Sequence, residues 1–134
     1  MARRLRCLAM ADPIASLLDE FFAGIERGDL EVVERLYADD VKVWHNVTGR
    51  ALDKADSVNL LRFWCSRVAG MRYEVLERRT YDGGATQRHI VHGESGGAPV
   101  RADVCIVFHV ADGQITRIYE YLDPAAVAAV FPAS

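Results

Sequence analysis

Apolar residues at helical spacing dominate the first part of the chain. Asp12 and Pro13 form a typical helix start, because the aspartate can cap free amide groups and proline is preset for the first helical turn. A second short stripe follows Asp29, which is placed to cap it, and extends to Tyr37. The pattern predicts a helical hairpin with its turn at Gly28. The first apolar stripe consists of Ile14, Leu17, Leu18, Phe21, Phe22 and Ile25.

A strand and a third helix are predicted next. Residues 41–46 alternate and are rich in residue types that favour strands. Lys42 must face water there, so the odd-numbered positions, including His45, are expected to face inward. A third amphipathic stripe then predicts a helix that begins near Asp53 and is ended by Gly70.

Strand-like runs follow one another over the rest of the chain. The connectors between them contain paired glycines or Asp-Gly, which are typical of hairpin turns and predict an antiparallel meander. A short last helix is expected over residues 125–131, because Asp123 and Pro124 repeat the helix start seen near the amino terminus. The runs span residues 72–80, 85–93, 100–110 and 114–122.

This order of elements predicts one α+β domain over residues 12–134. A chain of 134 residues fits one compact domain with a substantial core. The order α-α-β-α-β-β-β-β-α suggests a curved antiparallel sheet wrapped around helices, and the two together would enclose a pocket. Residues 1–11 are expected to form a loose tail, and the alternative is a true start at Met10.

Composition and charge exclude several classes of function. Hydrophobic residues make up 51% of the chain and its formal net charge is −3, so no basic surface for nucleic acid or an anionic membrane is expected. No apolar run has the length of a membrane span or of a signal-peptide core, so we expect a cytoplasmic protein. Cys7, Cys65 and Cys105 lack CxxC spacing, which favours reduced, mostly buried thiols over disulfides or a zinc site.

Two of the four histidines lie on strands that could bring them together. Even-numbered residues of 100–110 are all apolar from Ala102 onward, so this face is expected to line the pocket. For 85–93, alternation leaves open whether the odd-numbered set, with His89, or the even-numbered set faces inward. Buried imidazoles beside a carboxylate can move protons near neutral pH, so His45, His89 and Glu120 are candidates for such a site.

Four short motifs accompany the order of elements: Gly28-Asp29, Tyr37-Ala38-Asp39-Asp40, Asp112-Gly113-Gln114-Ile115 and Glu120-Tyr121-Leu122-Asp123. Together they resemble the cone-shaped nuclear transport factor 2-like (NTF2-like) superfamily, from about Ile14 onward. That superfamily includes SnoaL-like polyketide cyclases, ketosteroid isomerases, limonene epoxide hydrolases, dehydratases and non-catalytic binding domains. The resemblance therefore implies the fold and leaves the activity open. It also implies that His89 and Glu120 face inward.

Against ketosteroid isomerases, the resemblance places His45 where that family keeps its carboxylate general base. A histidine can do the same work. Phe21 and Ile106, however, stand near the places of the family's two hydrogen-bond donors, which implies that the isomerase mechanism does not transfer intact.

Against limonene epoxide hydrolases, the resemblance places Glu120 and His89 at the two catalytic aspartates. Gln87 falls at the arginine between them, and His45 falls at an asparagine that holds water. Only Glu120 has the same chemical type as the residue it replaces. The permanent positive charge of the arginine in the proton relay of that family is lost.

We therefore expect a cofactor-independent enzyme without a metal. His45 would be its general base or acid, His89 and Glu120 a coupled pair, and Gln87 a hydrogen-bond donor. The substrate would be a small apolar carbonyl or epoxide compound, such as a steroid, terpenoid or polyketide, that undergoes isomerisation, cyclisation, dehydration or hydrolysis. Expected substrate contacts are Phe21, Val43, Trp64, Val91, Ala102, Val104, Ile106, Phe108, Ile118 and Leu122.

Other interpretations of the same residues stay open. A single inward histidine is at least as often a core residue satisfied by a carbonyl or a water, and Glu120 could be a structural ion-pair partner of His89. Two histidines and a carboxylate also match a non-haem iron site, although these residues come from separate strands without HxD or HExxH spacing. The chain could finally be a non-catalytic ligand-binding domain or a dimerisation module with a filled core.

An apolar patch is predicted on the outer face of the sheet. Alternation places Trp44, Tyr119 and Tyr121 there with Cys105 and Val107. A patch of this size on a small domain usually meets a partner, so the sequence predicts a homodimer through the sheet.

Overall fold

A computed structural model describes residues 12–131 of the chain. The predicted tail, the alternative start at Met10 and Cys7 lie outside the described residues. Over the described range, none of the helices is long and apolar enough to cross a membrane. The described part is an α+β fold in which helices pack on one curved sheet, as the sequence predicted.

The elements follow the predicted order, with one short strand added. That strand, β2, pairs with the end of β1 and is too short for a sequence pattern to reveal. In chain order the elements are α2 (Pro13–Arg27), α3 (Leu30–Leu36), β1 (Tyr37–His45), β2 (Arg50–Leu52), α4 (Lys54–Arg67), β3 (Ala69–Tyr81), β4 (Gly84–Ser95), β5 (Ala98–Ala111), β6 (Gln114–Leu122) and the 3-10 helix η1 (Pro124–Val127).

The helix hairpin forms for the predicted reasons at its first helix. The Asp12 carboxylate accepts hydrogen bonds from two amides of the first turn of α2, and Gly28 ends that helix with a φ of 71°. The prediction that Asp29 caps α3 is wrong, because its side chain makes no capping hydrogen bond. Its carboxylate lies 3.6 Å from the guanidinium of Arg27 instead.

Three predicted helix boundaries are also corrected. Tyr37 begins β1 instead of completing α3, and its buried hydroxyl lies 3.2 Å from the hydroxyl of Ser57 on α4. The third helix ends at Arg67, and Gly70 lies within β3. The last helix is reduced to the short turn η1. In the first two cases the chain passes into a strand earlier than local propensity indicates, which is a tertiary effect. After η1 the chain continues as turns over residues 128–130.

The sheet has the strand order β2-β1-β6-β5-β4-β3 and is mixed. β3 to β6 form the predicted antiparallel meander, but β1 runs parallel to β6, so the prediction of an antiparallel sheet is wrong at this pair. Hairpin turns fix the directions from β3 to β6. β1 reaches the sheet from a helix, and no hairpin links it to β6.

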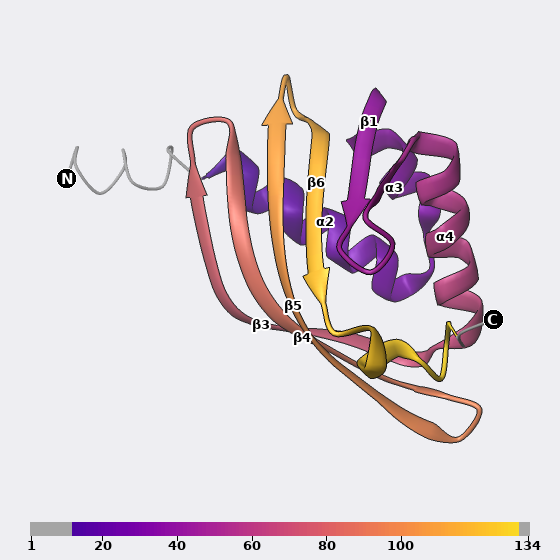
Figure 1. Cartoon of the computed structure of the whole chain (residues 1–134). Helices are drawn as coiled ribbons and strands as arrows, with labels where there is room; N and C mark the ends of the chain where they lie inside the picture. Colours follow the sequence, from indigo (N-terminus) through magenta and orange to yellow (C-terminus); the bar gives the residue numbers. More distant parts are fainter. Residues whose placement is uncertain (1–11, 132–134) are drawn as a thin grey trace.

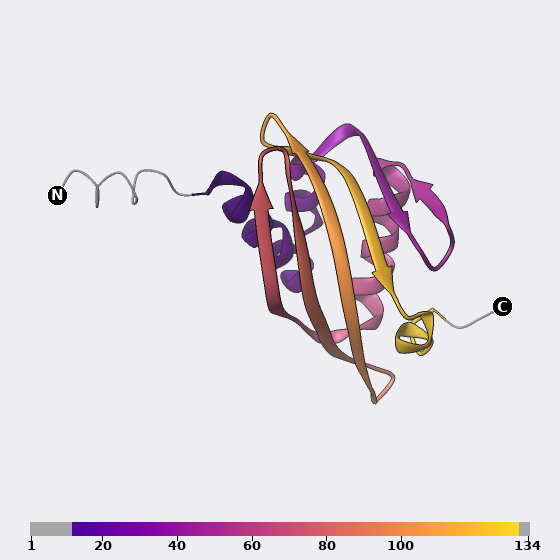
Figure 2. The same cartoon turned by 60° about the vertical axis from the view of Figure 1, so that its left-hand side comes forward.

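The helices cover one face of the sheet, which curves around them (Figures 1 and 2). Phe21 and Phe22 of α2 pack edge-on against Phe108, with ring centroids 5.9 Å apart in both pairs. Phe108 is completely buried. These aromatic rings fill the concave face beside α2.

Gly84 is expected to be intolerant of a side chain. A Cβ at this position would lie 2.4 Å from the carbonyl oxygen of Phe108, and backbone cannot move aside as a flexible side chain can. We expect Gly84→Ala to lower the free energy of unfolding by about 1–3 kcal/mol, measured by denaturant titration. Ser95→Ala, at the far end of the same strand, is the control and should change it by less than about 0.5 kcal/mol. Equal effects of the two variants would contradict the expected clash.

Candidate functional site

A cavity of about 400 Å³ lies between the concave face of the sheet, α4 and η1. Most of its lining is apolar, and His45 and Glu120 are the titratable pair on its wall. Phe131 stacks on Trp64, with ring centroids 5.8 Å apart. The lining residues are His45, Val47, Thr48, Arg50, Leu52, Leu60, Leu61, Trp64, Tyr73, Val91, Ala102, Val104, Glu120, Leu122, Pro124, Val127 and Phe131.

The predicted substrate contacts divide into two groups. Trp64, Val91, Ala102, Val104 and Leu122 line this cavity. The other predicted contacts are buried in the core and do not line it, because the aromatic rings of α2 occupy their end of the concave face. This corrects the prediction for Phe21, Val43, Ile106, Phe108 and Ile118.

His45 and Glu120 form the polar centre of the cavity wall. They are neighbours in register on the parallel strands β1 and β6. The imidazole Nε2 lies 3.2 Å from the carboxylate Oε1, and their side chains are only 16% and 25% exposed. An imidazole and a carboxylate at this distance can share a proton and orient one another. The predicted pairing of Glu120 with His89 is therefore wrong, and its partner is His45.

His89 is held by a different set of contacts. The Nε2 amide of Gln87 donates to His89 Nδ1 at 2.8 Å, and Arg78 Nε donates to Gln87 Oε1 at 2.7 Å. Arg78 in turn donates to Asp19 of α2 at 2.7 Å. Since an arginine can only donate, it fixes the Gln87 amide with its oxygen toward Arg78 and its NH₂ toward His89. His89 Nδ1 must accept, so the neutral ring carries its proton on Nε2.

The pKa of His89 is lowered from 6.5 to about 4, chiefly by burial; the negative charge of Glu120 opposes this change and the positive charge of Arg78 adds to it. The ring is therefore neutral at pH 7. Its Nε2 is fully buried and has no hydrogen-bond partner among the described residues. Such an orphaned donor is uncommon in a protein interior.

The polar groups thus form two separate clusters instead of one. Across the sheet, Ile106 of β5 lies between Glu120 and Gln87 in register. His89 sits one layer behind the cavity lining, beside Val104, and does not line the cavity itself. Arg78 also corrects the expectation that the site lost its positive charge. The positive charge is supplied by Arg78 on β3, which donates to Gln87.

The neutral state of His89 predicts a pH-dependent stability. The unfolded chain binds this proton at a higher pH than the native protein, so stability is complete above about pH 6.5 and is lost as the pH falls toward about 4. When the pH falls from about 7 to about 4, the free energy of unfolding should drop by about 3 kcal/mol more in the unaltered protein than in His89→Gln. Urea titrations at the two pH values measure this difference. His109→Gln, at an exposed histidine, should behave like the unaltered protein. Parallel losses in all three proteins would refute the buried neutral ring.

Tyr73 is a lining residue that the sequence analysis missed. It lies on β3, where it pairs with Val91. Register shifts on both sides of Tyr73 break the alternation of β3, so its inward face is not evident from the pattern. Met71 lies two residues before Tyr73 and is buried, and residues two apart in a strand face the same side, so Met71 was the signal that Tyr73 faces inward.

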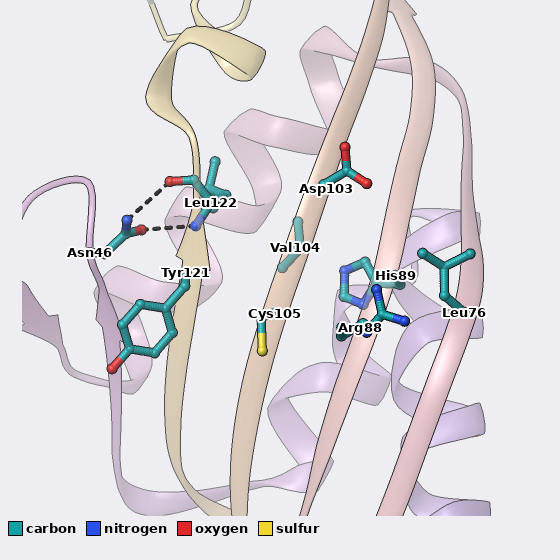
Figure 3. Close-up of a pocket in the computed structure, with 9 residues that line it drawn as sticks. All are labelled: Asn46, Leu76, Arg88, His89, Asp103, Val104, Cys105, Tyr121 and Leu122. Atoms are coloured by element: carbon teal, nitrogen blue, oxygen red, sulfur yellow. Dashed lines mark hydrogen bonds between the residues drawn. The ribbon is translucent and has the colours of Figure 1, made fainter.

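A second hollow, of about 370 Å³, lies on the outer face of the sheet (Figure 3). Arg88, Asp103, Cys105 and Tyr121 surround it, and Asn46 beside it is joined to the Leu122 backbone by two hydrogen bonds of 3.0 Å. Cys105 is exposed, which corrects the expectation of mostly buried thiols. His89 and Asp103 also belong to its lining, but no hydrogen bond or ion pair joins them among the described residues, and His89 is bonded to Gln87. The hollow is open to solvent, so the inner cavity is the better candidate site.

The predicted aromatic patch is present on this outer face. Trp44 lies 6.1 Å from Tyr119 and 5.3 Å from Tyr121, measured between ring centroids. The side chain of Tyr121 is 45% exposed.

No metal cluster is found in the range 12–131, where histidine, cysteine, aspartate and glutamate nowhere gather in a group of three or more that could hold an ion. His45 and Glu120 lie together, but His89 is turned to Gln87.

Comparisons with known proteins agree with this architecture. The family model described as a SnoaL-like domain matches residues 18–118. None of the curated proteins compared with the chain matches it. Several solved structures share its fold.

An LEH-like epoxide hydrolase from M. tuberculosis is 24% identical, covers 90% of this chain and 96% of its own, and has a TM-score of 0.71. IdmH from Streptomyces antibioticus, proposed to be a polyketide cyclase, is 18% identical over 91% of this chain and 99% of its own, with a TM-score of 0.75. PrhC from Penicillium brasilianum is 14% identical, covers 89% of this chain and 85% of its own, and has a TM-score of 0.79. At these identities the structures show a shared fold only.

Proposed function

The chain belongs to the SnoaL-like domain family, and we propose that it is a cofactor-independent enzyme that transfers protons on a small, mostly apolar carbonyl or epoxide compound. The observation that carries this proposal is the contact between His45 and Glu120 on the wall of an apolar cavity. A histidine–carboxylate pair shielded from bulk water is a common general acid–base unit.

In the proposed step, His45 takes a proton from a carbon of the bound substrate. Glu120 orients the imidazole and stabilises the imidazolium that forms. The electron pair of the broken C–H bond moves into the substrate toward its oxygen, and the imidazolium then returns a proton at the same or another carbon. This sequence consumes no cofactor and amounts to isomerisation. In a cyclisation the carbanion would instead attack a second carbonyl carbon of the substrate, and the imidazolium would protonate the oxygen formed there. In a dehydration the electron pair would expel a hydroxyl group, which leaves as water with the proton of the imidazolium. For an epoxide, the same base would act on a water molecule.

The test begins with thermal-shift measurements of three apolar probes: the bicyclic enone octalone, α-tetralone and limonene epoxide. Ligands that stabilise the protein are then followed for turnover, as deuterium uptake from D₂O for the ketones and diol formation for the epoxide. We expect at least one probe to be turned over faster than in buffer containing an equal concentration of imidazole. Stabilisation without turnover of any probe would identify a non-catalytic binding domain instead. Absence of both would favour a filled-core module.

We also propose that two copies of the chain pair through the outer aromatic patch. The clustered rings of Trp44, Tyr119 and Tyr121 support this, because contiguous exposed aromatic surface is typical of contacts between proteins. Trp44→Lys is expected to shift the protein from dimer to monomer in sedimentation equilibrium. Phe63→Lys, at an exposed aromatic of α4, should leave the assembly unchanged. A monomeric starting protein would contradict the proposal.

A further inference from the structure

Arg50 lies on the rim of the cavity, which is formed by the exposed lining residues Val47, Thr48 and Arg50. It is the register partner of His45 on the antiparallel strands β1 and β2, and both residues line the cavity. Side chains directly opposite in such a pair share a face of the sheet, with Cβ atoms about 5 Å apart. On the other side, the register partner of His45 is Glu120 of β6. The cavity wall therefore carries a row of three polar groups in which a permanent cation adjoins the proposed base.

The guanidinium of Arg50 has no acidic partner within the part of the chain that the structure describes. None of the ion pairs among residues 12–131 includes it. Glu120, the carboxylate of the cavity lining, lies 3.2 Å from His45 instead. A guanidinium presents five N–H donors in a planar fork that matches a carboxylate. An anionic group that enters the cavity would therefore meet a cation that no described acid occupies.

The turn that carries Arg50 is held against the sheet. The Gly49 amide donates to the His45 carbonyl at 2.9 Å, and the Asn46 amide donates to the Glu120 carbonyl at 3.0 Å. The Asn46 side chain adds two hydrogen bonds of 3.0 Å to the backbone of β6. The backbone at Arg50 is therefore placed beside the cavity before a ligand binds, which lowers the ordering cost of binding.

Thr48 supplies a second donor on the same rim. Its hydroxyl oxygen accepts a hydrogen bond from the Arg50 amide at 3.2 Å. A hydroxyl that accepts such a bond keeps its own O–H to donate, and none of the described residues accepts from it. Two oxygens of one anionic group can therefore be held together, one by the guanidinium and one by the hydroxyl.

We propose that the substrate is a keto acid with an apolar body, and that Arg50 binds its carboxylate at the cavity rim. This proposal rests on the proposed function of the His45–Glu120 pair and names the substrate class of that site. The apolar body lies against Trp64 and Val127. His45 takes a proton from a carbon beside the ketone, the C–H electron pair moves to the ketone oxygen, and the imidazolium returns a proton to the substrate.

The charges on the wall favour a carboxylate over a phosphate monoester. One guanidinium neutralises one negative charge, whereas a phosphate monoester carries about −1.5 to −2 at pH 7. Glu120 already places a negative charge on the same wall, so a second charge left uncompensated would be repelled. Because Arg50 and His45 are neighbours in register, the exchanging carbon is expected within a few bonds of the carboxylate.

The first experiment compares two compounds of the same shape, 4-phenylbutanoate and its neutral amide, 4-phenylbutanamide. Isothermal titration calorimetry gives their dissociation constants for the unaltered protein, Arg50→Gln, Arg50→Lys and the control Arg101→Gln, at an exposed arginine of β5 outside the cavity lining. The unaltered protein should bind the acid about tenfold more tightly than the amide, and Arg50→Gln should bind the two equally. Arg50→Lys should keep part of this preference and Arg101→Gln all of it. Unchanged amide affinity in Arg50→Gln shows that the cavity is intact.

The second experiment follows deuterium uptake from D₂O by 4-oxo-4-phenylbutanoate, at the carbon beside its ketone. Arg50→Gln should raise KM for this acid about tenfold and change kcat by less than about threefold, because a contact made equally in the ground and transition states acts on KM. KM for the corresponding neutral amide should be the same in both proteins.

Three results would overturn the proposal: equal affinities of acid and amide for the unaltered protein, an acid preference that survives in Arg50→Gln, or no binding of either compound. The outcome for proton transfer is separate. A preference for the acid that depends on Arg50, without deuterium uptake, would retain the carboxylate site and refute the acid–base function. Uptake by neutral ketones without any preference for the acid would retain the acid–base function and refute the carboxylate site.

Discussion

Replacing His45 with alanine is expected to abolish most of the proton transfer while leaving the cavity able to bind. Removal of a positioned general base typically slows a reaction by about 10²- to 10⁴-fold. The His45 side chain is 16% exposed and lies on the cavity wall, so its loss enlarges the cavity without opening the core. Deuterium uptake by octalone at saturating concentration measures the rate, and the thermal shift at the same concentration measures binding.

Matched variants separate this effect from a general disturbance. Glu120→Gln keeps the size of the partner and removes its negative charge, so it should slow exchange by about 10- to 100-fold. His109→Ala removes an exposed histidine of β5 and should leave the rate unchanged. Equal rates for His45→Ala and the unaltered protein would remove His45 from the mechanism.

The largest loss of stability is expected from Phe108→Ala. Phe108 is completely buried and contacts both Phe21 and Phe22 of α2. Truncation removes this contact between helix and sheet and leaves a cavity, which typically lowers the free energy of unfolding by about 3–5 kcal/mol. Chemical denaturation followed by tryptophan fluorescence gives the value.

Phe63→Ala is the matched control for that measurement. Its ring is 38% exposed on α4, so the loss should stay below about 1 kcal/mol. If Phe108→Ala lowered the free energy of unfolding no more than Phe63→Ala does, the packing of α2 on the sheet would not depend on Phe108.

The sequence predicted the order of elements well wherever local signals were strong. Asp12 and Gly28 carry the capping chemistry of α2, and the even-numbered apolar residues of β5 gave its inward face correctly. β6 has the predicted bounds, Gln114–Leu122. These are short-range properties, because caps, turns and alternation depend on residues close together in the chain.

The site could be predicted only in part, because its contacts depend on strand order. Alternation put His45 on the inward face, and the family resemblance put His89 and Glu120 there, but neither showed which of the two histidines would meet Glu120. The parallel pairing of β1 and β6, which joins His45 to Glu120, is a long-range property without a local signal. Tyr73 was hidden by the irregular register of β3.

The parallel pairing of β1 with β6 has a further consequence for how activity is acquired during synthesis. His45 is synthesised early and Glu120 almost last, so a nascent chain cannot bring the two side chains together until β6 has emerged from the ribosome. Any fragment that ends before β6 would contain His45 without Glu120. Turnover by this protein would therefore report completed folding of the whole sheet.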